Sequence, residues 1–189
     1  MTEADENYAG LIRQGRFNEL LEQFYRDEGE NIFNLVLHTV GDYDSAQDLV
    51  QESFIKIHRY VRQLRSPEVY RFWAYRIVVN TCKSFLRQQQ KDLQRLGDSH
   101  DEDMIIDETA ITPPDQFHNE SVRQALQQAL SQLTSDYRTV LLLYYYHDYK
   151  YDEIATILSL PLNTVKSQIR RAKQQLSRSL ARKKVEDAL

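Results

Sequence analysis

From Leu160 to Leu176 the chain reads LPLNTVKSQIRRAKQQL. Its apolar residues recur three or four positions apart, as on one face of a helix; they are Val165, Ile169, Ala172 and Leu176. The positions between them carry mostly cations, amides and hydroxyls. A shorter helical pattern, YDEIATIL, precedes this helix across a brief turn that contains proline. Two helices in this order, the second amphipathic with a cationic outer face, predict a helix-turn-helix.

The outer face of this helix has the side chains that DNA recognition requires. Arginine and lysine can reach guanine edges and phosphates, and amides and hydroxyls can bind other base edges. A solvated basic helix is the competing interpretation, and the short helix and turn before it favour DNA. The residues that we expect to face DNA are Asn163, Thr164, Lys166, Ser167, Arg170, Arg171 and Lys173.

Composition and charge bound the remaining possibilities. The chain has only 5 glycines and 4 prolines, which favours helix, and its single cysteine excludes an internal disulfide and a multi-cysteine zinc site. No apolar run is long enough to cross a bilayer, and the acidic start MTEADENYAG is unlike a signal peptide, so we expect a cytoplasmic protein. The net charge is −4, yet residues 154–185 contain no acid and residues 96–122 contain no lysine or arginine. This segregation indicates separate partners for separate segments.

The pattern along the chain predicts an all-α fold with two small helical domains. Helical periodicity covers residues 17–40, resumes in a helix that Asp44 or Ser45 can cap, and starts again at Pro67. It then stops in the acidic segment GDSHDEDMIIDETAITPPDQFHNE, which has no sustained period.

The domain boundaries follow from these breaks. We predict a helical domain at residues 1–95, an acidic flexible linker at 96–120 and the helix-turn-helix domain at 121–189. In the last domain, Thr134 or Ser135 can cap a helix that contains TVLLLYYYHDY. That run alone is also compatible with a strand, but the helical patterns on both sides favour helix.

Two helices of the first domain carry further candidate interfaces. In DYDSAQDLVQESFIKIHRY, acids and an amide share one face, which indicates either a protein-docking face or a solvated one; no histidine completes a metal site. In RSPEVYRFWAYRIVVNTCKSFLRQQQK, cations alternate with aromatics, as binding of single-stranded nucleic acid requires, although we expect most of these rings in the core. No nucleophile–base pair or phosphate loop is present, so we expect neither an enzyme nor a cofactor or small-molecule substrate.

Three segments, in this order, resemble those of a bacterial extracytoplasmic-function (ECF) sigma factor, a group-four relative of the primary sigma factor. DSAQDLVQESFIKI is similar to the family's core-polymerase docking helix, YRFWAYRIVVNTCKSFLR to its promoter-melting helix, and LTSDYRTVLLLYYYHDYKYDEIATILSLPLNTVKSQIRRAKQQL to its C-terminal promoter-reading domain. The resemblance therefore implies a region 2 bundle, a region 4 helix-turn-helix, and a protein that directs RNA polymerase to promoters and helps melt them.

The same resemblance implies partners and residue roles. The partners are core RNA polymerase, through its β′ clamp helices and β flap, promoter DNA, and an anti-sigma factor, which in many relatives is membrane-bound. The acidic linker would thread the positively charged RNA channel of the polymerase. The DNA-facing residues of the last helix would bind the minus-thirty-five element. The polymerase-binding residues would be Asp44, Asp48, Gln51 and Glu52. The minus-ten residues would be Arg65, Arg71, Trp73, Arg76, Asn80, Lys83 and Arg87.

Some positions depart from the family pattern. Lys150 stands where serine or threonine usually caps the first helix of the pair, so we expect Asp152 to cap instead. Ser159 and Asn163 stand where glycines are usual, and Asn163 can serve because asparagine tolerates the left-handed conformation. The alternative function is a stand-alone helix-turn-helix regulator with an N-terminal sensing or dimerisation domain, which leaves the acidic and aromatic helices unexplained.

Overall fold

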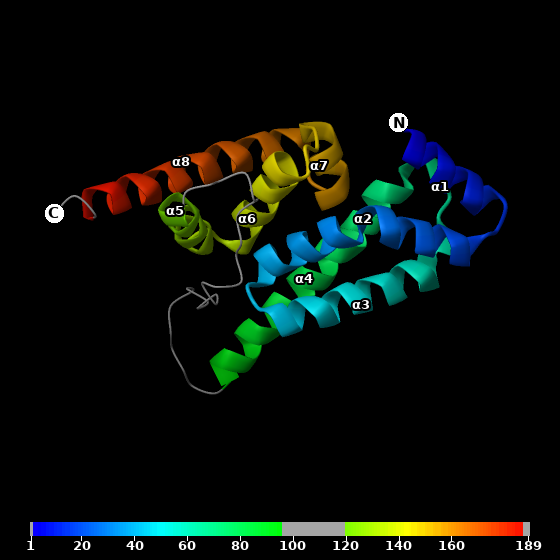
Figure 1. Cartoon of the computed structure of the whole chain (residues 1–189), viewed down its shortest axis with the longest axis horizontal. Coiled ribbons are helices and arrows are strands. Elements are labelled where there is room, and N and C mark those ends of the chain that lie inside the picture. The colour runs from blue at the N-terminus through cyan, green and yellow to red at the C-terminus, as the bar shows by residue number, and fades with distance from the viewer. Residues whose placement is uncertain (1, 96–119, 187–189) are drawn as a thin grey trace.

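The computed structural model describes residues 2–95 and 120–186, and throughout these ranges the regular elements are helices, as predicted (Figure 1). The first half contains α1 (Glu3–Arg13), α2 (Phe17–Val40), α3 (Tyr43–Tyr60), the short 3₁₀ helices η1 (Val61–Gln63) and η2 (Pro67–Val69), and α4 (Tyr70–Arg95). The second half contains α5 (Glu120–Ser131), α6 (Ser135–Leu141), the π-helical turn η3 (Leu142–Tyr146), α7 (Tyr151–Leu158) and α8 (Leu162–Glu186). Apart from Glu120, the predicted acidic linker lies outside the described residues.

The first half is a bundle in which α2 and α3 lie side by side and α4 crosses behind them (Figure 1). Its core is built on large buried side chains, among them Phe24, Ile57 and Tyr70. The turn between α2 and α3 needs Gly41, which adopts φ 81° and donates its N–H to the carbonyl of Leu37 at 2.8 Å. The bundle thus consists of long helices, and the end of α2, residues 35–40, is buried all round.

The capping residue of α3 differs from the expected one. Asp42, and not Asp44 or Ser45, is the N-cap; its carboxylate accepts a hydrogen bond from the Ser45 N–H at 2.7 Å. The prediction placed the cap two or three residues too late, because aspartate and serine both suit that position. As a result, Asp44 lies in the first helical turn with its side chain exposed.

The sequence analysis did not predict α1. This helix begins at a reciprocal cap in which the Asp5 N–H bonds to the Thr2 hydroxyl and the Thr2 N–H bonds to the Asp5 carboxylate. Tyr8 is fully buried against Phe24 and Tyr70, with ring centroids 5.6 and 5.5 Å apart. One aromatic ring therefore anchors a helix that is otherwise largely polar.

In the second half, the run of leucines and tyrosines is helical, as predicted. Thr134 caps α6 by accepting from the Tyr137 N–H, and α6 continues into η3, where the His147 N–H bonds to the Leu142 carbonyl five residues earlier. The N-cap of α7 is Lys150, whose N–H donates to the Glu153 carboxylate at 2.8 Å. The expectation that Asp152 caps this helix is wrong, because the glutamate one residue further reaches back instead.

The turn between α7 and α8 also differs in detail from the prediction. Ser159 takes the left-handed conformation with φ 54°, and α8 already begins at Leu162, so Asn163 lies inside its first turn. Val165, Ile169 and Ala172 are buried as the sequence predicted, which fixes the outward direction of the remaining side chains. The helix-turn-helix is therefore formed, with Ser159 in the role expected of Asn163.

The two halves pack against each other: α6 and η3 contact α2, and α7 contacts α4 (Figure 1). Asn34 donates to the hydroxyl of Tyr146 at 2.9 Å across this boundary. Arg138 donates to the last carbonyls of α2. In the described part of the chain no helix is both long and apolar enough to cross a membrane.

Candidate polymerase and nucleic-acid interfaces

The outer face of α8 is cationic and solvated. Lys166, Arg170 and Arg171 are exposed along it, while Val165 and Ile169 on the opposite side are almost completely buried. Each apolar side chain buried in this way contributes about 1.5–3 kcal/mol, enough to hold the cationic face outward. Of the other predicted DNA-facing residues, Asn163 is exposed and Thr164, Ser167 and Lys173 are partly exposed.

Lys173 differs from its neighbours because it faces aromatic rings of its own domain. Its ammonium lies 5.1 Å from the ring centre of Tyr144 and 4.8 Å from that of Tyr145. The hydrogen bond to the Tyr145 hydroxyl raises the pKa of Lys173. Of the predicted set, Lys173 thus has a defined intramolecular position at the edge of the cationic face.

The residues predicted for the minus-ten element divide into two groups. Arg65, Asn80 and Arg87 are exposed, and Trp73 is half-buried against Tyr70. The other three, Arg71, Arg76 and Lys83, have partners within the protein.

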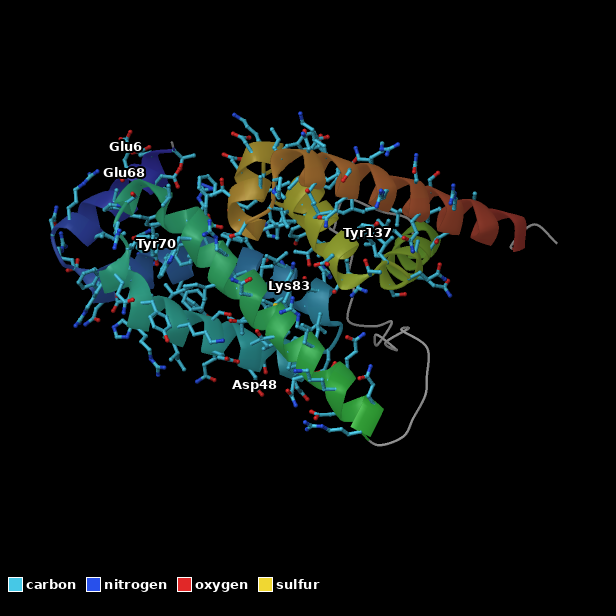
Figure 2. The ribbon with its side chains drawn as sticks, turned by 180° about the vertical axis from the view of Figure 1, so that it is seen from behind. Glu6, Asp48, Glu68, Tyr70, Lys83 and Tyr137 are labelled. Carbon is cyan, nitrogen blue, oxygen red and sulfur yellow. The ribbon has the colours of Figure 1, made fainter. Side chains whose placement is uncertain are left out.

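Arg71 joins α4 to α1 and α2. Its Nε lies 3.1 Å from a carboxylate oxygen of Asp5 and 3.6 Å from one of Glu28. Arg76 and Lys83 instead contact the second half: Arg76 donates to the Thr156 carbonyl at 2.5 Å, and the Lys83 ammonium lies 2.8 Å from the Asp136 carboxylate. Figure 2 shows Lys83 on the side of α4 that faces the C-terminal helices.

The acidic face of α3 lies on the outside of the first bundle. Asp44, Asp48, Gln51 and Glu52 are all exposed, and Glu52 forms an ion pair with Lys56 one turn later at 2.6 Å. Asp48 lies away from α8 and the helix-turn-helix (Figure 2). The structure therefore brings the four predicted residues onto one accessible helix surface.

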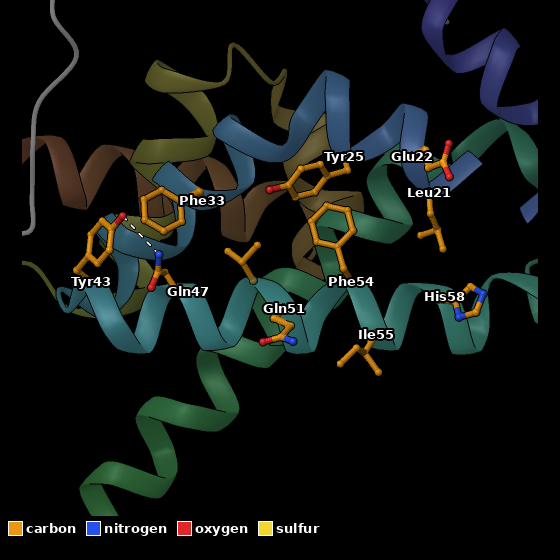
Figure 3. Close-up of a pocket in the computed structure, with 11 residues that line it drawn as sticks. Leu21, Glu22, Tyr25, Phe33, Tyr43, Gln47, Gln51, Phe54, Ile55 and His58 are labelled. Atoms are coloured by element: carbon orange, nitrogen blue, oxygen red, sulfur yellow. Dashed lines mark hydrogen bonds between the residues drawn. The ribbon is translucent and has the colours of Figure 1, made fainter. Parts of the chain in front are cut away.

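Beside this face is a groove between α2 and α3, with a volume of about 800 Å³ (Figure 3). Large apolar side chains line it although they are exposed: Tyr25 at 62%, Tyr43 at 55% and Ile55 at 52%. The sequence analysis described the helical periodicity of these two segments but singled out no exposed apolar residue, and so missed the groove. The available signal was that Tyr25 and Ile55 each directly follow another apolar residue, which widens the apolar side of each helix beyond a narrow stripe.

Chemically, these surfaces can bind but offer no reacting groups. Within residues 2–95 and 120–186, no three histidine, cysteine or acidic side chains converge as a metal site would require. Cys82 is buried, and burial raises the pKa of its thiol to about 12, so it is not a nucleophile at neutral pH.

Comparisons with known proteins assign a family to each half. Residues 24–92 match the family described as Sigma-70 region 2, and residues 123–176 match Sigma-70, region 4. RNA polymerase sigma-H factor of Pseudomonas aeruginosa is 29% identical over 189 residues, covering 94% of each chain. ECF RNA polymerase sigma-E factor of Escherichia coli is 30% identical over 168 residues, covering 86% of this chain and 85% of its own.

The fold is also that of a solved sigma factor. The structure of the sigma factor RpoE in complex with the anti-sigma factor NepR from Bartonella quintana superimposes with a TM-score of 0.68 at 21% sequence identity. The match covers 85% of this chain and 96% of that one, so it spans both helical halves.

Proposed function

This chain is an ECF-type sigma factor of the sigma-70 family, which directs transcription initiation without being an enzyme, and on that premise we propose how its parts divide the work. Residues 1–95 bind core RNA polymerase in the cytoplasm and engage the minus-ten element, residues 121–189 bind the minus-thirty-five element, and residues 96–120 connect them. Unstacking DNA costs about 1.4 kcal/mol per base-pair step. Contacts to the polymerase, the duplex and unpaired bases must together offset that cost.

The observation that carries the proposal is the two-sided character of α8. A buried apolar side fixes its orientation, and Lys166, Arg170 and Arg171 project from the opposite side with no carboxylate between them along the helix. Exposed arginines at this density suit phosphate and guanine contacts in a major groove. We assign the minus-thirty-five contacts to this face.

The polymerase contact is assigned to α3 and the adjoining groove. The exposed acids supply charge that can pair with a basic partner, and the apolar side chains of the groove supply buried area on binding. Interfaces commonly combine an apolar centre with a polar rim. Here the rings of Tyr25 and Phe54 lie between α2 and α3, and Gln51 and Ile55 lie at the edge of the groove on α3 (Figure 3). This surface is proposed to receive the β′ clamp helices.

We assign the first contacts with the minus-ten element to those of its predicted residues that are accessible. Arg65, Asn80 and Arg87 are exposed and Trp73 is half-buried against Tyr70, so these four residues are proposed to reach DNA in the arrangement described. Arg76 and Lys83 become available only when their contacts with α7 and α6 are given up. An anti-sigma factor is a further proposed partner, supported by the fold shared with RpoE in its complex with NepR.

Run-off transcription tests the assignment as a whole. Core polymerase is incubated with promoter fragments in the presence and absence of the full chain, and transcripts from new start sites are expected only in its presence. Arg170→Ala on the proposed DNA face should reduce them, and Arg178→Ala, exposed further along α8, serves as the matched control. Equal losses in both variants would show that general charge, and not the proposed face, determines promoter use.

A further inference from the structure

Two histidines, His38 and His147, lie where the two halves of the chain are in contact. His38, near the end of α2, is 3% exposed and packs edge-on against Tyr146 of η3, with ring centres 5.8 Å apart. His147 follows η3 and packs against Tyr75 of α4 at 5.7 Å and against Tyr149 at 6.3 Å. Tyr146 and His147 are themselves 5.0 Å apart. The rings form one aromatic cluster to which both halves contribute.

The surroundings of both imidazoles disfavour a positive charge. Nδ1 of His38 and Nε2 of His147 are buried and have no hydrogen-bond partner within the described residues. Arg138 of α6 lies beside His38, and its positive charge disfavours protonation of that imidazole. The two histidines lie near each other, so a proton on His38 disfavours a proton on His147. Burial, with these charges, lowers the pKa of both imidazoles to about 4.

The other ionisable groups of the cluster do not reverse this lowering of the imidazole pKa values. Burial raises the pKa of Tyr75 and Tyr149, so both hydroxyls are neutral near pH 7. The carboxylate of Glu28 in α2 already accepts a hydrogen bond from the Tyr75 hydroxyl at 2.8 Å and lies close to the guanidinium of Arg71. The cluster is therefore suited to two neutral imidazoles.

We propose that His38 and His147 form a proton-sensitive latch, which holds the two halves together while both imidazoles are neutral and releases them on protonation. Separation gives each imidazolium fuller access to water, which the closed cluster restricts: His38 is buried there and His147 is only partly exposed. The latch joins the same surfaces that hold Arg76 on Thr156 and Lys83 on Asp136. Release would free these two side chains for DNA; that consequence rests on the proposed function, whereas the latch itself does not.

The size of the effect follows from linkage. An imidazole with a pKa of about 4 in the closed form and about 6.5 in water favours the open form roughly 10-fold at pH 5.5, and hardly at all at pH 7.5. Two such groups shift the ratio of open to closed chains about 100-fold over this range. Ordinary carboxylates remain largely ionised at pH 5.5, so ion pairs such as Lys83–Asp136 contribute little to the change.

Small-angle X-ray scattering of the full chain at pH 7.5 and pH 5.5 tests the latch, with far-ultraviolet circular dichroism to verify that the helices persist. The radius of gyration should increase at pH 5.5 in the natural chain and in the control His58→Phe, whose histidine is exposed on α3. The double variant His38→Phe/His147→Phe should remain compact at both values. A natural chain that stays compact at pH 5.5, or a double variant that opens equally, would overturn the proposal.

A second measurement needs no variant. Titration of the imidazole protons by nuclear magnetic resonance should give His38 and His147 pKa values of about 4, and values near 6.5 for these two residues would also overturn the latch. If the chain opens but minus-ten DNA still does not bind, the proposed roles of Arg76 and Lys83 fail and the latch stands.

Discussion

Arg138 of α6 donates a hydrogen bond from Nη1 to the main-chain carbonyl of Thr39, 3.0 Å away at the end of α2. The same guanidinium donates to the carbonyls of Leu130 at 3.1 Å and Leu133 at 2.9 Å, near the end of α5. Arg138 is 3% exposed, and burial lowers its pKa to about 10. One cation thus satisfies carbonyls that two helix ends leave without partners, and it does so across the boundary between the halves.

Replacing Arg138 should destabilise the chain more than any exposed arginine does. Arg138→Met leaves several buried carbonyls unpaired, which should cost about 3 kcal/mol of unfolding free energy. Urea denaturation followed by circular dichroism measures it, with Arg59→Met on the exposed end of α3 as the control. If the two variants lose equal stability, the buried hydrogen bonds of Arg138 contribute nothing measurable.

Ser159 should be improved by glycine. Its φ of 54° costs a residue with a side chain about 1 kcal/mol, which glycine avoids at the expense of a more flexible unfolded chain. Ser159→Gly is therefore expected to raise the unfolding free energy by about 0.5 kcal/mol. Thermal unfolding checks this, with Thr156→Gly inside α7 as a control that should instead lose about 0.3 kcal/mol. A loss at both positions would contradict the argument.

Ile55 should matter for polymerase binding and little for folding. Because its side chain is 52% exposed at the α2–α3 groove, Ile55→Ser removes apolar contact area from the proposed interface without opening the core. We expect the dissociation constant for core polymerase to rise roughly 10-fold, equivalent to about 1.4 kcal/mol, by fluorescence anisotropy. Val69→Ser, at an exposed apolar residue outside the groove, should bind normally. Normal binding by both variants would remove the groove from the interface.

Arg171 allows base contact and phosphate contact to be told apart. If its exposed guanidinium reads a base edge, Arg171→Ala should cost about 1–3 kcal/mol on the preferred promoter and relax the preference at one position. Transcription from a set of promoters varied one base at a time measures this. An equal loss on every promoter would instead identify a phosphate contact.

The sequence predicted what local rules control. The three- and four-residue spacing of Val165, Ile169 and Ala172 determined which side of α8 is buried. Thr134 or Ser135 was predicted to cap the helix with the leucine and tyrosine run, and Thr134 is the residue that caps α6. The leucine and tyrosine run was predicted to be helical from its flanks, and α6 with η3 confirms this. Each of these features depends on residues close together along the chain.

What the sequence could not predict depends on distant residues. The bond from Arg76 to Thr156 joins residues 80 positions apart, and neither residue type signals such a partner. The groove beside Ile55 exists only because α2 lies next to α3, and the helix pattern alone treats that isoleucine as a core residue. The family resemblance supplied residue roles, but not which of those residues are covered when the two halves are in contact.

The link between α1 and α4 should depend on pH with a defined sign. Burial alone would raise the pKa of Asp5, but hydrogen bonds from Thr2 and the charge of Arg71 outweigh it and hold that pKa below its usual 3.8. The stabilisation is therefore present above about pH 4 and is lost as the pH falls below it.

Asp5→Asn, which also removes the carboxylate that accepts from Thr2, should cost about 1 kcal/mol at pH 7. Because the natural chain also loses its carboxylate in acid, the difference between the two should shrink towards pH 2, which urea denaturation at both pH values measures. Glu6→Gln, at an exposed acid of the same helix, should show no such convergence. A deficit for Asp5→Asn that is the same at both pH values would show that its ionisation plays no part.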